Sequence, residues 1–240
     1  MSCWRSRVRT SVLLAFLASP LAAQEGESGY CLLAPIKDTN LSFSGRELVK
    51  EVVVQLGQEV HAGDIVMRLD GAGMPARYER SLAELRQAER AMERAEMLGR
   101  VMIAEERDRR ETDLAVKAAS AREMELELER LNLRAPHDGI VVSIAVQEGE
   151  MLEDSAAMRI VDLSQLLVEI DVPSDRFGQF DAGQEVKIRT ESGAIVAATV
   201  VFADPIIDLA SKSFRVNAVL ENADREFVAG TSCMLVSTAK

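Results

Sequence analysis

One stretch of this chain occurs twice, without a gap, at a constant offset of 92 residues. The first copy runs from Val49 to Asp70 and the second from Val141 to Asp162. The matched pairs include Val52 with Ile144, Val54 with Val146, Gln55 with Gln147, Gly57 with Gly149, Val60 with Leu152, Val66 with Met158, Leu69 with Val161 and Asp70 with Asp162. Each copy is too short to bury its own apolar face. We therefore predict that the two copies pack together after the intervening chain has gone out and returned.

The first copy reads as short strands separated by tight turns. Val52–Val54 and Ile65–Met67 are strand-like runs, and Gly57 and Gly63 punctuate them, the latter followed by Asp64. Glycine adopts positive φ at the lowest cost, so these positions are expected to reverse the chain.

The segment between Met74 and Leu133 changes to a helical period. Two apolar seams recur in it: Tyr78, Leu85, Ala88, Met92 and Ala95, then Leu114, Ala121, Met124, Leu128 and Leu131. Dense charges surround both seams, which is typical of solvated helix faces. Leu98–Val101 is the expected reversal, with Gly99 ending the first helix. This pattern predicts an antiparallel hairpin whose first helix, of about 25 residues, makes an arm of roughly 35–40 Å.

After Asp162 the chain returns to strands separated by turn residues. Five runs are expected: Leu166–Val172, Glu185–Arg189, Ile195–Phe202, Phe214–Leu220 and Ser232–Val236. Their spacing is typical of an antiparallel β-barrel or sandwich.

The first 23 residues have the pattern of a cleaved secretory signal. Arg5, Arg7 and Arg9 precede a short apolar run, and Ala22-Ala23 offers small residues for cleavage. An uncleaved anchor is the alternative, but about eight apolar residues fall short of the roughly 20 that a spanning helix needs. The mature chain has 25 basic and 39 acidic residues, a net charge of −14. That charge excludes nucleic acid as an expected partner.

Two cysteines remain after cleavage, Cys31 and Cys233. In an oxidising compartment only one pairing is available, and it would tie the N-terminal segment to the last strand. Two free, half-buried thiols are the alternative.

Residues that carry chemistry are scarce. His61 and His137 are the only histidines, and neither belongs to a cluster at metal-ligand spacing. No nucleophile elbow, phosphate-binding loop or dinucleotide fingerprint is present. The sequence therefore predicts a protein that is not an enzyme and has no cofactor or metal.

The motifs resemble those of the periplasmic adaptor subunits, the HlyD-like membrane fusion proteins of tripartite efflux and secretion systems. The resemblance rests on Glu51–Val54, Gly57–Asp64, Leu133–Val141, Val172–Asp175, Ala182–Val186, Ser213–Val216 and Ala229–Met234, and it covers residues 40–237. Among these residues, the positions expected to form the lipoyl-like turns are Gly57, Gly63, Asp64, Pro136, Asp138, Gly139 and Gly149.

The resemblance implies a mainly β chain with an inserted α-helical hairpin. Its expected parts are a signal peptide (1–23), an N-terminal segment with the first barrel strand (24–44), the first half of a split biotinyl/lipoyl-like domain (45–72), a coiled-coil hairpin (73–133), the second lipoyl-like half (134–163) and an antiparallel β-barrel (164–240).

The family function implies a periplasmic ring, expected to be hexameric, that couples an inner-membrane transporter to an outer-membrane channel for export of small molecules. A resistance-nodulation-division pump is the favoured transporter, and an ATP-driven exporter is the alternative. Because the chain ends at Lys240 just past the last barrel strand, contact with the transporter is expected from the barrel and the N-terminal segment.

In many family members a hairpin-tip motif, Arg-x3-Leu-x6-Ser, docks the channel. Arg94 and Leu98 match it, Gly99 and Arg100 complete the tip, and Glu105 replaces the serine, which puts docking in question. Pairing of Arg94 with a nearby acid is the structural alternative.

Two other functions are alternatives to the adaptor role. A biotin or lipoate carrier needs a lysine at the turn between the halves, whereas the only lysine of the excursion, Lys117, lies inside a predicted helix. A stand-alone envelope scaffold with the same domains stays open.

Overall fold

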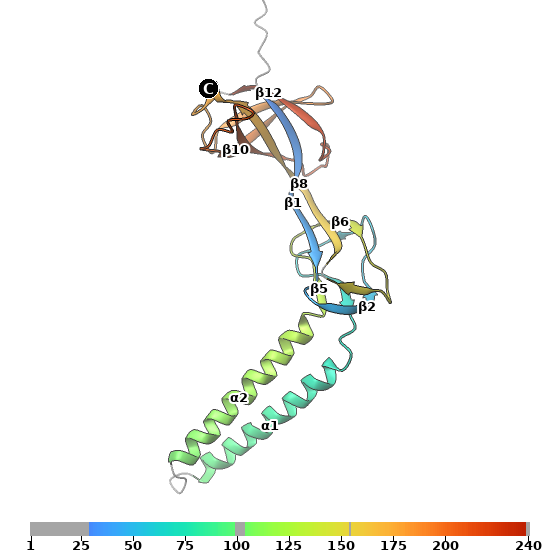
Figure 1. The fold of residues 1–240 in the computed structure, drawn as a ribbon, viewed down its shortest axis with the longest axis vertical. Helices are drawn as coiled ribbons and strands as arrows, with labels where there is room; N and C mark the ends of the chain where they lie inside the picture. The colour runs from blue at the N-terminus through green and yellow to red at the C-terminus, as the bar shows by residue number, and fades with distance from the viewer. Residues whose placement is uncertain (1–28, 99–103, 154, 239–240) are drawn as a thin grey trace, which may run out of the picture.

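A computed structural model describes residues 29–98, 104–153 and 155–238. The signal segment 1–23 and the tip residues Gly99 and Arg100 lie outside the described residues. The molecule is elongated, with a β-barrel at one end, a lipoyl-like domain in the middle and a two-helix hairpin at the other end (Figure 1). The expected fold class, mainly β with an inserted hairpin, is confirmed.

The elements follow one another along the chain in the order β1 (Tyr30–Ser42), β2 (Arg46–Val52), β3 (Glu59–Val60), β4 (Ile65–Leu69), α1 (Met74–Leu98), α2 (Ala104–Glu129), β5 (Asn132–Arg134), β6 (Gly139–Ile144), β7 (Met151–Glu153), β8 (Ala156–Pro173), the 3₁₀ turn η2 (Ser174–Arg176), β9 (Glu185–Thr190), β10 (Ile195–Ala203), β11 (Ser213–Glu221) and β12 (Ser232–Thr238).

The lipoyl-like domain consists of two four-stranded layers. One has the order β5-β4-β2-β7, and the other is formed by β3, β6, the first part of β8 and the last part of β1. They share one apolar core, whose fully buried members include Val49, Val66, Met67, Val141, Leu152 and Ile160. Both copies of the repeat thus contribute to the core, and Leu131, Leu133 and Ala135 from the segment before the second copy add to it.

The two copies hold each other through reciprocal backbone hydrogen bonds. Gly57 N donates to Val141 O at 2.8 Å, and Gly149 N donates to Val49 O at 2.8 Å. The members of these two bonds are related by the 92-residue offset. Both glycines have positive φ, 82° and 84°. The prediction that the copies pack together after the intervening chain has gone out and returned is therefore confirmed. The two copies exchange equivalent backbone hydrogen bonds, an arrangement that we call the pseudo-twofold exchange.

The excursion is the hairpin of α1 and α2. At 1.5 Å per residue its 25-residue first helix is roughly 37 Å long. Ala88, Ala95 and Ala121 are buried between the helices, and the other predicted seam residues are buried or half-buried. Small residues at the seam let the helices approach closely, as the two apolar repeats predicted.

The helical region was expected to run to residue 133, and this prediction is wrong at its end. α2 stops at Glu129, and Asn132–Arg134 form β5 beside β4. Leu131, in the turn that follows α2, and Leu133, in β5, are both buried in the lipoyl-like core. The seam residue Leu131 fits a helical and a strand period equally well, so the pattern alone did not mark the boundary.

The barrel contains the five strands expected after Asp162, within β8 to β12, and β1 completes it. The order is β1-β12-β9-β10-β11-β8, and β8 also pairs with β1, so the cylinder closes. The centre of the barrel is filled by apolar side chains that are 0% exposed, among them Val168, Ile170, Val186, Ile188 and Val216. Closure removes the sheet edges that a sandwich would leave.

β1 and β8 belong to both domains. β8 runs for 18 residues without interruption across the expected boundary between residues 163 and 164. β1 pairs with it from Tyr30 opposite Asp171 to Ser42 opposite Ala156. The two domains are therefore joined by a two-stranded antiparallel ladder.

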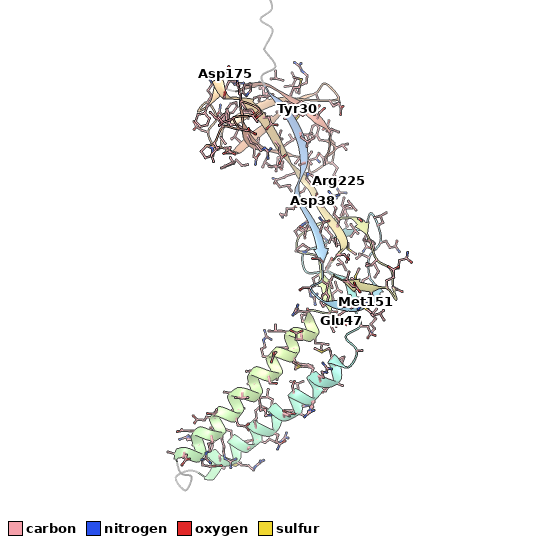
Figure 2. All side chains as sticks on the ribbon, in the orientation of Figure 1. Tyr30, Asp38, Glu47, Met151, Asp175 and Arg225 are labelled. Carbon is pink, nitrogen blue, oxygen red and sulfur yellow. A yellow bond between two sulfur atoms is a disulfide. The ribbon has the colours of Figure 1, made fainter. Side chains whose placement is uncertain are left out.

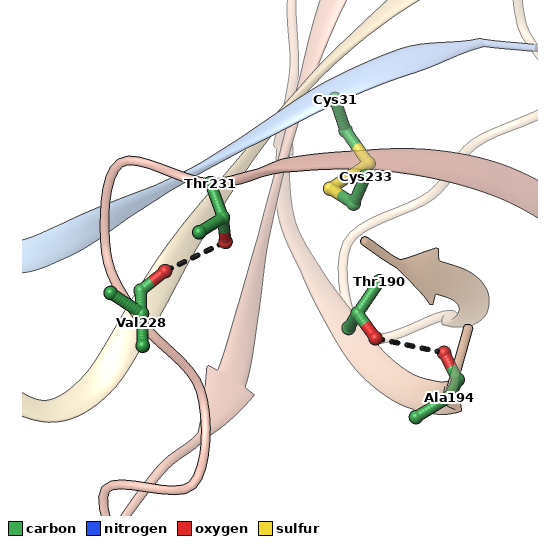
Figure 3. The surroundings of a disulfide bond; sticks show 6 residues. All are labelled: Cys31, Thr190, Ala194, Val228, Thr231 and Cys233. Atoms are coloured by element: carbon green, nitrogen blue, oxygen red, sulfur yellow. Dashed lines mark hydrogen bonds between the residues drawn. A yellow bond between two sulfur atoms is a disulfide. The ribbon is translucent and has the colours of Figure 1, made fainter. Parts of the chain in front are cut away.

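Cys31 and Cys233 form a disulfide inside the barrel (Figure 3). They face each other in the β1–β12 pairing, with Cα atoms 4.8 Å apart, and are 0% and 2% exposed. The bond fastens β1, the strand that closes the barrel, to β12.

Removing this disulfide is expected to destabilise the barrel. The bond spans 202 residues of sequence, so the Cys31→Ala/Cys233→Ala variant should lose about 2–5 kcal/mol of unfolding free energy in urea denaturation. A reductant should bring the wild type to the same level and leave the double variant unchanged. An unchanged wild-type melting temperature after reduction would contradict the expectation.

Two turn glycines should respond differently to substitution. A Cβ on Gly139 would lie 2.5 Å from Val161 O, so Gly139→Ala should cost about 1–3 kcal/mol. Gly57 has open space but a φ of +82°, so Gly57→Asn should cost less than Gly57→Ala, because asparagine tolerates left-handed backbone. At Gly139 the order should reverse, with Asn worse than Ala. Urea midpoints measure both series, and a Gly139→Ala midpoint equal to wild type would rule out the close backbone approach.

Candidate functional site

The described members of the expected docking motif flank the hairpin tip. Arg94 lies in the last turn but one of α1, and Glu105 lies in the first turn of α2. Glu105 accepts a hydrogen bond from Arg109 Nη2 at 2.5 Å, and both side chains are about 70% exposed. An acid in the first turn is stabilised by the helix dipole, so Glu105 has a local role in starting α2. Leu98 ends α1.

Arg94 is exposed and makes no ion pair within the described part of the chain. Three arginines of α2, in contrast, pair with glutamates one turn away: Arg107 with Glu111, Arg109 with Glu105 and Arg110 with Glu106. The structural alternative, an ion pair between Arg94 and a nearby acid, is not observed among the described residues. As far as the described residues go, the Arg94 guanidinium has no ion-pair partner and is exposed to contact another molecule.

The expected lipoyl-like turns form one hydrogen-bonded cluster between the two copies. Asp64 Oδ2 accepts from His61 N at 2.8 Å, and Asp138 Oδ1 accepts from Ala62 N at 2.8 Å. Gly63 N donates to Ala135 O at 2.8 Å. Asp138 therefore satisfies a backbone donor of the opposite turn, and Asp64 satisfies one within its own turn, which is a structural task in both cases.

His137 is buried at the same turn, next to the exposed Pro136. Its Nδ1 donates to Asp138 O at 2.8 Å, which leaves Nε2 to accept from Thr39 Oγ1 at 3.0 Å in the neutral ring. This histidine links β1 to the second copy.

Arg134 fixes the base of the hairpin on the lipoyl-like domain. Its Nε and Nη2 donate to Glu129 Oε1, at the end of α2, and its Nη1 donates to Gly63 O at 2.8 Å. One planar guanidinium thus connects the last helical residue with a turn of the first copy. The resemblance includes Arg134 in the motif Leu133–Val141 but gives this residue no role. In the structure its role is to hold the end of α2 on the lipoyl-like domain.

A polar cluster marks the junction where the ladder passes from one domain to the other. Asp162 Oδ1 accepts from Ser164 N at 3.0 Å and from Ser164 Oγ at 2.6 Å, and Lys37 Nζ lies 3.5 Å from Asp162 Oδ2. Burial raises the pKa of Asp162, but the hydrogen bonds from Ser164 and the Lys37 ammonium outweigh it and hold that pKa below its usual range.

Two residues of the β11–β12 loop complete the junction. The buried Asn222 donates from its backbone to Ser164 O at 2.9 Å and from Nδ2 to Leu163 O at 3.0 Å. Arg225, labelled at the junction in Figure 2, has its Nη2 2.6 Å from Glu59 Oε1 of the lipoyl-like domain. These contacts could not be predicted from the sequence, because their partners lie from 58 to 166 positions apart in the chain and no local pattern pairs them.

The contacts described so far join parts of this one chain to each other. In the described ranges, no group of three or more His, Cys, Asp or Glu side chains is placed to hold a metal ion. No helix of the described part is long and apolar enough to cross a membrane. Exposed features of the described residues include Arg94 and Glu105, which flank the hairpin tip, and the loops of the barrel.

Comparison with known proteins agrees with this architecture. The family model of the CzcB-like, barrel-sandwich hybrid domain matches residues 6–162. Nodulation protein NolF of Rhizobium meliloti is 28% identical, and the match covers 80% of this chain but 58% of NolF, so the chain spans a little over half of that relative.

Two solved structures share the fold. The MacA-MexA chimeric protein, which contains the Pseudomonas aeruginosa MexA α-hairpin domain, matches with a TM-score of 0.75 at 18% identity, covering 88% of this chain and 81% of the chimera. The membrane fusion protein Spr0693 from Streptococcus pneumoniae R6 matches with a TM-score of 0.68 at 14% identity, covering 88% and 97%. The chain belongs to the CzcB-like barrel-sandwich hybrid family and has the membrane fusion protein fold.

Proposed function

We propose that this protein is a periplasmic adaptor that couples an inner-membrane transporter to an outer-membrane channel for the export of small molecules. The observation that carries the proposal is the linear arrangement of three joined parts, with the hairpin tip at one end and the barrel loops at the other (Figure 1). The two exposed ends are separated by a lipoyl-like domain that both the ladder and Arg134 hold in place. Such a molecule is suited to contact two partners at once.

The hairpin has the stiffness that a spacer arm needs. Lys117 Nζ of α2 donates to Glu84 Oε2 of α1 at 2.8 Å, and Arg80 Nε donates to Glu84 Oε1 at 3.0 Å. The hydrogen bond from Lys117 lowers the pKa of Glu84, and Glu84 in turn raises the pKa of Lys117. Both groups therefore stay charged at neutral pH, and the cross-helix contact fixes the register of the two helices.

The same contact argues against a biotin or lipoate carrier. A carrier presents its lysine at an exposed turn for modification, whereas Lys117 lies in the middle of α2 with its ammonium on Glu84. The connection between the two copies is the hairpin itself. An adaptor role accounts for this insertion and a carrier role does not.

We also propose export to the periplasm and assembly into a ring, expected to be a hexamer. The buried Cys31–Cys233 disulfide supports an oxidising compartment. By resemblance the transporter is a proton-driven resistance-nodulation-division pump, and an ATP-driven exporter is the alternative that the experiment below would identify.

Crosslinking in the native envelope tests the adaptor role directly. The mature protein, tagged after Lys240, is crosslinked, purified and analysed by mass spectrometry. We expect a polytopic inner-membrane transporter and an outer-membrane channel to be recovered together, and the identity of the transporter reveals its class. Recovery of self-oligomers alone would favour a scaffold outside any pump.

Channel docking at the tip is tested by removing the Arg94 guanidinium. Arg94→Ala should lower recovery of the channel severalfold and leave recovery of the transporter unchanged, because Arg94 is exposed near the tip and has no ion pair with any described residue. Arg86→Ala is the matched control, since Arg86 is also exposed but lies eight residues, about 12 Å, further from the tip. Equal channel recovery from the two variants would contradict docking through Arg94.

A further inference from the structure

The loop between β10 and β11, Asp204–Lys212, lies at the barrel end remote from the lipoyl-like domain. Ser174 N donates to Lys212 O at 2.9 Å, and Ser213 is opposite Pro173 at the end of β8. Figure 2 labels Asp175, next to this contact, at the outer end of the barrel, and Arg225 at the junction. The loop therefore faces away from the hairpin.

Two large aliphatic side chains project from this loop into solvent. Leu209 is 89% exposed and Ile206 is 72% exposed. Among the large hydrophobic side chains of the described residues, none is more exposed than Leu209. Single exposed aliphatic residues are ordinary, but two of them three positions apart on one loop form a candidate contact surface.

The loop is held in shape by its own hydrogen bonds. Asp204 N donates to Arg215 O and Asp208 N donates to Ser213 O, both at 2.8 Å. The Asp204 and Asp208 carboxylates accept from Ile206 N at 2.9 Å and from Ala210 N at 2.7 Å. Little backbone entropy is therefore left to lose when Ile206 and Leu209 are covered, so the loop backbone is preorganised for binding.

The recess behind the loop, which Ile206 helps to line, is acidic, because its three carboxylates outnumber Arg215 and Lys212, the cations of the recess and of the loop. It has a volume of about 410 Å³ and is lined by Asp171, Asp204 and Asp208 with one guanidinium, that of Arg215. Arg215 Nε is 3.9 Å from Asp171 Oδ1, which leaves two carboxylates without a cation at ion-pair distance in the described structure. The charge complement of this surface is basic, which disfavours an anionic membrane and a second copy of this acidic chain.

We propose that the Asp204–Lys212 loop is a docking surface for a folded protein that offers an apolar recess bordered by Lys or Arg side chains. Ile206 and Leu209 are the anchors that enter the recess, and Asp204 and Asp208 meet its basic rim. The proposal rests on the proposed function, in which this partner is the periplasmic part of the inner-membrane transporter.

The test compares two exposed ends of the same barrel in the full mature chain. The Ile206→Ser/Leu209→Ser variant should lower recovery of the crosslinked transporter at least tenfold. Val228→Ser is the control, because Val228 is 66% exposed in the β11–β12 loop, which faces the junction. Asp204→Lys/Asp208→Lys should also lower recovery, by charge repulsion. Melting curves check that each variant is folded.

A photoreactive amino acid in place of Leu209 identifies what covers the loop. A crosslink to the recovered transporter, absent from position 228, supports the proposal. A crosslink to a second copy, or wild-type binding to phosphatidylcholine vesicles that the Ser variant loses, would overturn it, as would undiminished transporter recovery by that variant. If the wild-type chain recovers no transporter at all, the proposed function itself fails and this proposal falls with it.

Discussion

The antiparallel ladder between β1 and β8 is the constraint on which the rest of the structure depends. It closes the barrel at one end and supplies two strands of the lipoyl-like domain at the other, so neither domain is complete without it. Its register shifts once between the domains, between Pro35 and Lys37, beside the buried Asp162. A shared ladder limits the ways in which two domains can move, whereas a flexible linker would leave the barrel free. The ion pair of Arg225 with Glu59 braces the same junction from the side.

The pseudo-twofold exchange explains how a domain can tolerate a long insertion. Each copy satisfies the backbone of the other through bonds such as Gly57 to Val141, so the domain is stabilised across the copies and not along the chain. The connection between the copies can therefore be a long helical hairpin without loss of these bonds. Arg134 fixes the orientation of the hairpin on the domain, because it holds the end of α2 against the turn at Gly63.

Much of the fold could be predicted because the signals are periodic or repeated. The 92-residue repeat predicted the packing of the two copies, the alanine-rich seams predicted the hairpin, and alternating runs predicted β8 to β12. The end of α2 was misplaced because Leu131 satisfies two periods at once. At the tip, the sequence identified Arg94 and Glu105 as positions of interest, but their local behaviour depends on neighbours: Glu105 pairs with Arg109, while Arg94 stays unpaired in the described residues.

The sequence by itself determined the element types, the order of the modules and the pairing of the two copies, because these follow from local hydrophobic period and from self-similarity. Only the tertiary structure decided how the modules are joined. The β1–β8 ladder, the Cys31–Cys233 register and the contacts of Asn222 and Arg225 link residues that are far apart in the chain. Such pairings depend on the closure of the barrel, which brings the first strand beside the last, and no local pattern records that closure.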